Sequence, residues 1–278
     1  MVDDIHKGMD DIEKKLQDAA KKLLKDSVVD CVIGYEKSGG NVVPCFVENP
    51  ADAKRLVWNT GCIQNLSVYL KDVEGRVAVV AKGCDSRSIV ELIKQNQVDK
   101  DKVVVLGISC EGMKDASGKI YDKCKNCAHP NPLIYDIFLG DEKKGADADY
   151  SDIVEIESMT IEQRRKFWKD QFKKCIKCYA CRNICPMCYC EKCALEDKKW
   201  VSKSDRYDDV WMFHLVRAFH IAGRCTNCGE CERACPVNIP LGKIYKKIEK
   251  DIKELFGYEA GVSIDDEPPM AAFDVDKD

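Results

Sequence analysis

Hydrophobic positions in the first part of the chain change from a helical period to a strand period. Apolar side chains recur every three to four positions across residues 4–26, which predicts an amphipathic helix. Residues 28–33 and 42–47 are short, apolar runs on either side of the turn sequence Ser-Gly-Gly-Asn at 38–41. We therefore expect a β-hairpin after the first helix.

Beyond the hairpin the two periods alternate. The pattern predicts helices at 51–58 and 62–70, a buried strand at 76–81, a helix at 85–97 and a second buried strand at 102–108. Strands that alternate with helices of this length are typical of a parallel sheet. The expected fold class of this part is α/β with a largely parallel sheet.

The second half of the chain begins after a small, charged stretch at 141–157 that has the composition of a linker. Thr160 and Gln163 form a capping-box signature at the start of a helix, and helical patterns return at 210–222 and 241–256. The expected organisation is an α/β domain at 1–140, a linker at 141–157, a ferredoxin-like α+β dicluster domain with flanking helices at 158–258 that carries an insertion at 186–224, and an acidic, disordered tail at 259–278.

Two cysteine runs share one spacing, C-x-x-C-x-x-C-x-x-x-C-P. In bacterial ferredoxins three thiolates of such a run bind one [4Fe–4S] cube, and the fourth, before the proline, binds the other cube. The spacing therefore predicts two cubes with crossed ligands. One cube would be bound by Cys175, Cys178, Cys181 and Cys235, and the other by Cys225, Cys228, Cys231 and Cys185.

Structural zinc sites are the alternative, because zinc also takes four thiolates from short C-x-x-C spacings. Zinc needs only two such pairs, however, and has no use for a third cysteine and a Cys-Pro in each run. The cluster interpretation is favoured.

A third four-thiolate site is expected in the α/β domain. Cys84 and Cys110 each follow the end of a predicted strand, and Cys124 and Cys127 form a C-x-x-C in a nearby loop. Because ligands of parallel sheets gather at the carboxyl ends of strands, these four residues could bind a third [4Fe–4S] cluster. Buried structural thiols and a zinc site remain the alternatives.

The insertion begins with three further cysteines, Cys188, Cys190 and Cys193. They could bind a fourth metal centre with one more thiolate from Cys31, Cys45 or Cys62, or they could be thiols packed against the neighbouring clusters. His214 and His220 lie six positions apart and do not share a helix face, so we interpret them as packing residues.

Composition and charge indicate the cellular compartment and the kinds of partner to expect. The chain has 278 residues, 18 cysteines and a formal charge of −4, and one third of its residues are charged. The charges are interleaved, which argues against nucleic-acid binding. The charged first residues contain no signal segment, and no apolar run is long enough for a membrane span. A reducing cytoplasm, where thiols stay free to bind metal, is expected.

The motif order resembles the beta-subunit family of deazaflavin-reducing hydrogenases and formate dehydrogenases. The similar residues are Gly83-Cys84-Asp85, Gly107-Ile108-Ser109-Cys110, Cys124-x-x-Cys127 and Phe138-Leu139-Gly140-Asp141. The Cys84 segment is also similar to the Arg-Pro-Cys-Asp pattern of sulfhydrogenase and anaerobic sulfite reductase electron-transfer subunits, with Lys82-Gly83 in place of Arg-Pro. The second half resembles the dicluster modules of heterodisulfide-reductase-type complexes.

The leading hypothesis is an iron–sulfur subunit that relays electrons between other redox subunits of a cytosolic anaerobic oxidoreductase complex. The rival is a catalytic flavoprotein subunit that reduces a deazaflavin or nicotinamide cofactor, because the family that the chain resembles often binds FAD through its first domain. The best phosphate-binding position for FAD is Gly61-Cys62, where a helix is predicted to begin. A third interpretation is a zinc-stabilised assembly scaffold.

Overall fold

The computed structural model describes residues 2–147, 149–197 and 207–269. It divides into two compact units, Met1–Ala148 with Gly261–Ile264 and Asp149–Ala260 with Asp265–Asp278. We call these the first unit and the second unit. The main elements of the first unit are α1 (Val2–Lys25), β1 (Cys31–Ser38), β2 (Asn41–Val47), β3 (Val77–Ala81), α2 (Gly83–Lys94), β4 (Val103–Ile108), α3 (Asp122–Lys125) and β5 (Ile137–Leu139).

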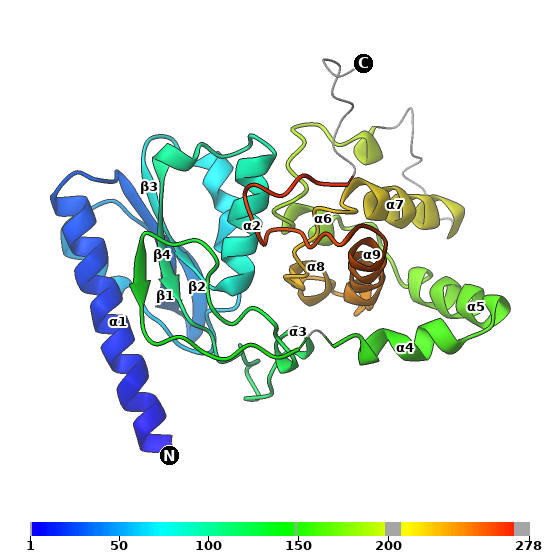
Figure 1. The fold of residues 1–278 in the computed structure, drawn as a ribbon, viewed down its shortest axis with the longest axis horizontal. Coiled ribbons are helices and arrows are strands. Elements are labelled where there is room, and N and C mark those ends of the chain that lie inside the picture. The colour runs from blue at the N-terminus through cyan, green and yellow to red at the C-terminus, as the bar shows by residue number, and fades with distance from the viewer. Residues whose placement is uncertain (1, 148, 198–206, 270–278) are drawn as a thin grey trace. The chain divides into compact units, whose positions relative to one another are not determined.

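Five strands of the described residues form one sheet in the order β2-β1-β3-β4-β5 (Figure 1). β1 and β2 are antiparallel around the Gly39-Gly40 turn, with register pairs from Val32↔Val47 to Ser38↔Asn41. The other three pairings are parallel. The mostly parallel α/β sheet predicted from the sequence is confirmed, with the hairpin at one edge and β5 at the other.

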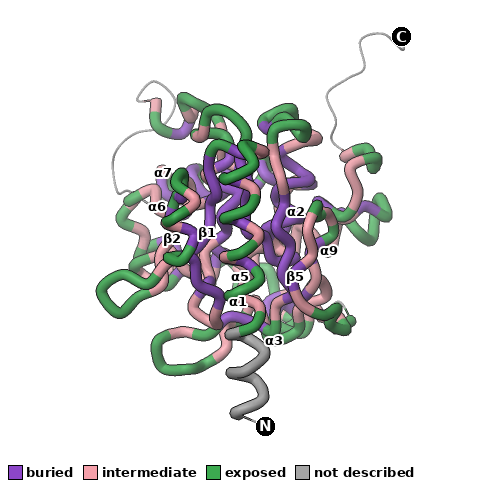
Figure 2. The backbone as a smooth tube through the Cα atoms, turned by 90° about the vertical axis from the view of Figure 1, so that its left-hand side faces the viewer, coloured by how far each residue is buried: buried purple, intermediate pink, exposed green. Residues whose placement is uncertain are grey.

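The core of the first unit lies on both faces of this sheet. All five residues of β3 are buried, as expected for a central strand of small and β-branched side chains that is covered on both sides. Figure 1 shows α1 and α2 on opposite sides of the strands, and the tube view shows the strands as largely buried (Figure 2). This arrangement holds the carboxyl ends of β3 and β4 at one edge of the unit.

A glycine lets the chain close over the start of α2. A Cβ atom at Gly83 would lie 1.8 Å from the His129 carbonyl oxygen and 2.8 Å from that of Asn131. The loop after Cys127 can therefore approach the first turn of α2 only because residue 83 has no side chain. Sequence-distant cysteines at 84 and 127 are brought toward each other by this contact.

The α-helices predicted at 51–58 and 62–70 are wrong. The structure has short 3₁₀ helices, η1 (Pro50–Arg55) and η2 (Leu66–Asp72), with Asn49 and Asn65 as their caps. The Asn65 side chain accepts hydrogen bonds from both the backbone N–H and the hydroxyl of Ser67, at 3.1 and 2.6 Å. Such local side-chain bonds favour tight turns over longer helices. The remaining 3₁₀ helix of this unit is η3 (Lys100–Lys102).

The described part of the second unit consists of helices and loops and contains no strand, so the predicted ferredoxin-like α+β arrangement is not confirmed in detail. The capping box at its second helix is present: Gln163 N–H donates to Thr160 Oγ1 at 3.2 Å, and Thr160 N–H donates to Gln163 Oε1 at 2.8 Å. Its elements are α4 (Ser151–Ser158), α5 (Ile161–Phe172), α6 (Ala180–Asn183), η4 (Ala194–Glu196), α7 (Tyr207–His220), α8 (Glu230–Arg233) and α9 (Leu241–Phe256).

Two stretches expected to lack structure contain ordered residues. α4 lies within the predicted linker, where Ile153 and Ile156 are buried and Lys250 bonds Glu157 at 2.9 Å. In the predicted disordered tail, Gly261 N–H donates to Glu91 Oε1 at 2.8 Å within the first unit. Two buried isoleucines order the first stretch and a backbone hydrogen bond holds the start of the second, and neither contact is apparent in a charged composition. Residues 198–206 of the insertion and 270–278 of the tail lie outside the described residues.

Candidate iron–sulfur sites

The two cysteine runs fold into copies of one loop. Lys177 and Tyr179 have φ of 51° and 59°, and Asn227 and Gly229, at the same places in the second run, have φ of 54° and 69°. Each loop then enters a short helix, α6 or α8. Left-handed backbone is costly for lysine and tyrosine. Its presence at equivalent positions indicates that the loop geometry, rather than residue preference, determines the path of the chain.

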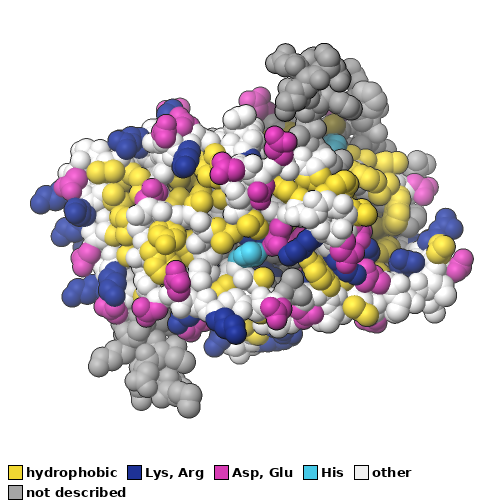
Figure 3. Space-filling view, viewed as in Figure 1, with side chains coloured by type: hydrophobic (Ala, Val, Ile, Leu, Met, Phe, Trp, Pro, Cys, Tyr) yellow, Lys and Arg dark blue, Asp and Glu magenta, His cyan; other side chains and the backbone are white. Residues whose placement is uncertain are grey.

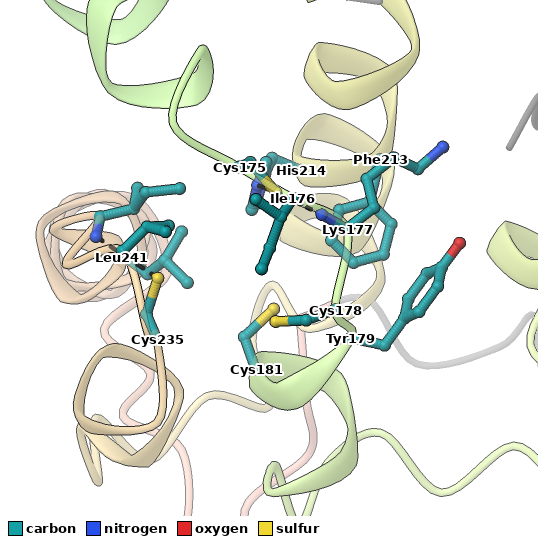
Figure 4. A pocket seen from close by; sticks show the side chains of 12 residues that line it. Cys175, Ile176, Lys177, Cys178, Tyr179, Cys181, Phe213, His214, Cys235 and Leu241 are labelled. Atoms are coloured by element: carbon teal, nitrogen blue, oxygen red, sulfur yellow. Dashed lines mark hydrogen bonds between the residues drawn. The ribbon is translucent and has the colours of Figure 1, made fainter. Parts of the chain in front are cut away.

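Site A is a pocket whose walls carry four of the predicted cluster ligands (Figure 4). Cys175, Cys178 and Cys181 come from the first run, and Cys235 comes from the end of the second run on the other side of the space. Backbone N–H groups donate to two of these sulfurs, from Lys177 to Cys175 Sγ and from Ile239 to Cys235 Sγ, both at 3.4 Å. The four thiols are thus arranged around one space that backbone dipoles make favourable for negative charge.

His214 is part of site A, contrary to its interpretation as a packing residue. Its Nε2 lies 3.4 Å from Cys175 Sγ, its ring stacks on Phe172 at 4.5 Å with an angle of 5°, and its side chain is 2% exposed. Burial, and to a smaller extent the charge of Arg217, lower the pKa of His214 to about 3. The ring is therefore neutral, and against a cluster-bound Cys175, which carries no proton, Nε2 would be the nitrogen that donates.

Site B brings Cys185 of the first run together with the second run. Burial raises the pKa of Cys225 above its ordinary value, and the charges of Cys228 and Cys185 raise it further. Burial also raises the pKa of Cys231, and the other three thiolates add to that rise against the opposing charge of Arg217. Raised pKa values favour the protonated thiols, and the iron of a bound cluster would be the cation that holds these four groups as thiolates.

A buried arginine from the insertion lies beside both sites. Arg217 is 1% exposed, its Nη2 donates to the Cys181 carbonyl oxygen at 2.9 Å, and its Nη1 donates to the Tyr245 hydroxyl. Burial opposes its charge, but Tyr245 and the thiolates of Cys185 and Cys231 hold its pKa well above the ordinary value. In the described part of the chain it makes no ion pair with a carboxylate, and its buried Nε has no partner. The cysteine groups therefore supply much of the negative charge around this cation.

Site C groups the four cysteines that the sequence placed in the α/β domain. Burial, with smaller contributions from the charges of Cys124 and Cys127 and against the charge of Lys82, raises the pKa of Cys110 to about 11. Burial and then Asp85 raise the pKa of Cys84, and Cys110 also contributes. Gly112 N–H donates to Cys110 Sγ at 3.3 Å. The electrostatic coupling shows that thiols from α2, the β4 end and α3 lie near one another.

Site C also has a buried cation, but this one is paired. Lys82 Nζ lies 2.8 Å from Asp85 Oδ2, and it donates to the Tyr35 hydroxyl at 2.5 Å and to the Gln64 carbonyl at 3.0 Å. Burial opposes the charge of Lys82, but Asp85 and then Cys84 raise its pKa above the ordinary value. The Lys82–Asp85 pair is nearly neutral as a unit, unlike Arg217.

The remaining predicted ligands have different surroundings in the described residues. The Cys188 side chain is hydrogen-bonded to Cys185 at site B. This hydrogen bond, together with Arg217 and against the effect of burial, lowers the pKa of Cys188 to about 7. Cys190 is exposed and Cys193 caps η4. The proposed donors of a fourth thiolate, Cys31, Cys45 and Cys62, are buried in the first unit.

The phosphate-binding position predicted at Gly61-Cys62 lacks the helix opening on which it depended. Gly61 N–H already donates to Asn59 Oδ1 at 2.8 Å, and Cys62 Sγ accepts from Asn59 N–H at 3.3 Å. Burial raises the pKa of Cys62 to about 12. The next helical turn begins only at Leu66 and is 3₁₀.

Within residues 2–147, 149–197 and 207–269, no three His, Cys, Asp or Glu side chains gather closely enough to hold one metal ion. Among the same residues, no helix is both long and apolar enough to cross a membrane.

Comparison with known proteins agrees with this geometry. Residues 171–239 match the 4Fe-4S dicluster domain family. The chain is 26% identical to the F420-dependent formate dehydrogenase subunit beta of Methanocaldococcus jannaschii, over 86% of this chain and 89% of the relative. The F420-dependent formate dehydrogenase 1 subunit beta of Methanococcus maripaludis is 28% identical over 90% of each chain. The predicted resemblance to the formate dehydrogenase beta subunits is confirmed.

One solved structure aligns with less than half of the chain. A chain of the xenon-derivatised F420-reducing [NiFe] hydrogenase complex from Methanosarcina barkeri aligns with 38% of this chain and 42% of its own length, with 17% identity and a TM-score of 0.32. The dicluster match and the two relatives together describe an iron–sulfur chain related to subunits of oxidoreductases.

Proposed function

We propose that the chain is an iron–sulfur electron-transfer subunit that relays electrons within a cytoplasmic, anaerobic oxidoreductase complex of the formate dehydrogenase, hydrogenase or heterodisulfide-reductase type. The observation that carries the proposal is the presence of two complete four-cysteine groups, site A and site B, in one 4Fe-4S dicluster domain. When bound, a [4Fe–4S] cube supplies a one-electron couple.

The residues of each site bind and tune such a cube. Four thiolates complete its ligation, so no position is left for a substrate. Burial, the backbone N–H groups of Lys177 and Ile239, and the His214 ring bonded to Cys175 would set the potential at site A. Chemistry on a substrate would therefore belong to a partner subunit, and a relay needs such partners on both sides.

Site C is proposed as a third [4Fe–4S] site, held by Cys84, Cys110, Cys124 and Cys127. Its support is the mutual electrostatic coupling of these thiols and the N–H bond from Gly112 to Cys110 Sγ. Gly83 also supports the proposal, because its lack of a side chain permits the loop after Cys127 to approach Cys84.

A flavin-containing subunit that reduces F420 is the alternative, and the names of the two relatives favour it. The alignment with the M. jannaschii subunit has 341 positions, but 86% of 278 residues is about 239, so roughly 100 positions have no counterpart in this chain. Together with the occupied N–H of Gly61, this shortness favours the relay over the flavoprotein.

The first experiment is anaerobic isolation of the full chain with quantification of iron, sulfide, zinc and flavin. We expect about twelve iron atoms and no flavin, since three cubes are proposed. Eight iron atoms with one zinc would contradict the third cluster and would assign site C to zinc. Stoichiometric flavin, with turnover of F420 by the isolated chain, would favour the alternative.

The second experiment tests the crossed ligands by paramagnetic resonance of reduced variants. Cys185→Ser should alter the same signal as Cys228→Ser and spare the other, because Cys185 is coupled to the second run. Cys235→Ser should correspondingly match Cys178→Ser. A Cys185→Ser spectrum that matches Cys178→Ser instead would contradict the crossed assignment, and Cys188→Ser controls for substitution of a neighbouring thiol.

A further inference from the structure

The segment that delivers the chain to site A is strongly basic, although the whole protein is acidic. Between Ile161 and Cys178 there are seven Lys or Arg residues against Glu162 and Asp170, a net charge of +5, whereas the chain carries −4. All other residues together therefore carry −9. Five of the basic side chains are exposed and form what we call the basic face: Arg165, Lys166, Lys169, Lys173 and Lys174.

Helix stability accounts for part of this distribution of charge. Cations near a helix carboxyl end are favourable, which covers Lys169, Lys173 and Lys174 at the end of α5. Lys166 pairs with Asp170 one turn further on, at 2.6 Å. The segment still keeps a net charge of +5 after this pairing, and Figure 3 shows Lys and Arg side chains where Figure 1 draws α5.

The basic face lies next to the part of site A that reaches the surface. Cys178 is exposed and Ile176 is 64% exposed, while Cys181 and Cys185 are buried. Only two residues separate α5 from Cys175, and Phe172, the last residue of α5, stacks on His214. The basic face is therefore joined by a short connection to the exposed residues Ile176 and Cys178.

The cysteine run of site B carries no comparable excess of positive charge. The run from Cys225 to Cys235 contains Glu230 and Glu232 against Arg233, a net charge of −1, and all of its cysteines are partly covered. Two loops of the same backbone shape thus differ in the charge around them. This asymmetry distinguishes one end of the dicluster domain as a contact site.

We propose that the basic face, with Ile176 and Cys178, is the docking surface for a redox protein whose one-electron centre is rimmed by aspartate and glutamate. This proposal rests on the proposed function. One electron leaves the reduced centre of the acidic partner and enters the cube at site A, and no bond is made or broken. Opposite charges would steer the encounter, while Ile176 supplies a small apolar centre for a transient contact.

The test measures reduction of the full, cluster-loaded chain by a reduced acidic [2Fe–2S] ferredoxin in a stopped-flow instrument. The variant is Arg165→Glu with Lys166→Glu and Lys169→Glu. The matched control is Lys14→Glu with Lys21→Glu and Lys25→Glu, three exposed positions of α1 that change the net charge equally. Reduced methyl viologen, a small cation, serves as a second reductant for every protein.

At low salt we expect the variant to be reduced by ferredoxin about tenfold more slowly than wild type, because electrostatic steering contributes about 10- to 1000-fold to such rates. Its rate should also lose most of its salt dependence, and the control should change less than twofold. Viologen should reduce all three proteins without slowing. If viologen reduces none of them, the proposed function fails and not merely the docking site.

Equal ferredoxin rates in variant and wild type, with viologen reduction intact, would overturn the docking proposal alone. An equal slowing in the α1 control would overturn it as well, since net charge rather than location would then decide the rate. Binding of duplex DNA or anionic vesicles that is lost in the variant, with an unchanged ferredoxin rate, would assign the basic face to those partners instead.

Discussion

The hydrogen bond from His214 to Cys175 should raise the reduction potential of the cluster at site A. Nε2 lies 3.4 Å from Cys175 Sγ and the ring is held by stacking on Phe172. A donor stabilises the reduced cube more than the oxidised one, because the reduced cube carries more negative charge. Replacement of His214 by Phe keeps a ring on Phe172 and removes the donor, so the potential should fall.

The size of the shift follows from the strength of one hydrogen bond. A typical net contribution is about 1 kcal/mol. For a one-electron couple about 1.36 kcal/mol corresponds to about 59 mV. If the reduced form gains about 1 kcal/mol more than the oxidised form from this donor, His214→Phe lowers the potential of site A by about 40 mV.

The assay is a redox titration followed by paramagnetic resonance, with iron content as a check on cluster loading. His220→Phe is the matched control, because His220 is on the same helix and exposed. The signal altered by Cys178→Ser identifies site A. A fully loaded His214→Phe protein with an unchanged potential at site A would refute the reasoning, as would an equal fall at both sites, which would indicate a general change in packing.

Three further predictions follow from the structure. Arg217→Met should lower the potentials of both site A and site B, whereas Arg217→Lys should largely retain them, because the buried charge lies beside both cysteine groups; redox titration checks this. Ser27 has a φ of 53° after the end of α1, so Ser27→Gly should stabilise the fold by about 1 kcal/mol and Ser27→Val should destabilise it in thermal unfolding. Gly83→Ala should remove about four iron atoms and spare both dicluster signals, because its Cβ would collide with the His129 carbonyl; metal analysis with resonance spectra would contradict this if iron content stayed unchanged.

The elements predicted well are those whose signal is local. β3 and the end of β4 are buried, and both strands are short, apolar runs rich in β-branched residues, which favours a strand over a helix of that length. The start of α5 is predicted by the capping-box residues Thr160 and Gln163. The hairpin turn is predicted by two adjacent glycines, which have positive φ in the structure. The spacing of the cysteine runs likewise predicts that Cys235 lies close to the cysteines of the first run. In the structure, Cys235 lines the pocket of site A together with them.

The parts that could not be predicted depend on contacts between distant segments. His214 and Arg217 come from the insertion between the two runs, and neither stands at a motif spacing from any cysteine. Their roles arise only when α7 packs against α5 and brings the His214 ring onto Phe172. β5 has three residues, too few for a period to be recognised, and its strand character comes from pairing with β4.

The two buried cations, Lys82 and Arg217, give the cysteine groups different electrostatic surroundings. Lys82 is matched by Asp85 at 2.8 Å, so its charge is largely cancelled before it reaches Cys84 and Cys110. Arg217 donates to a hydroxyl and a carbonyl and is also hydrogen-bonded to Cys188, so its charge acts on the cysteine groups around it. A buried charge without a counter-ion is strongly destabilising on its own. If cubes are bound at sites A and B, their negative charge would stabilise the buried Arg217, and cluster binding would then favour folding of the second unit.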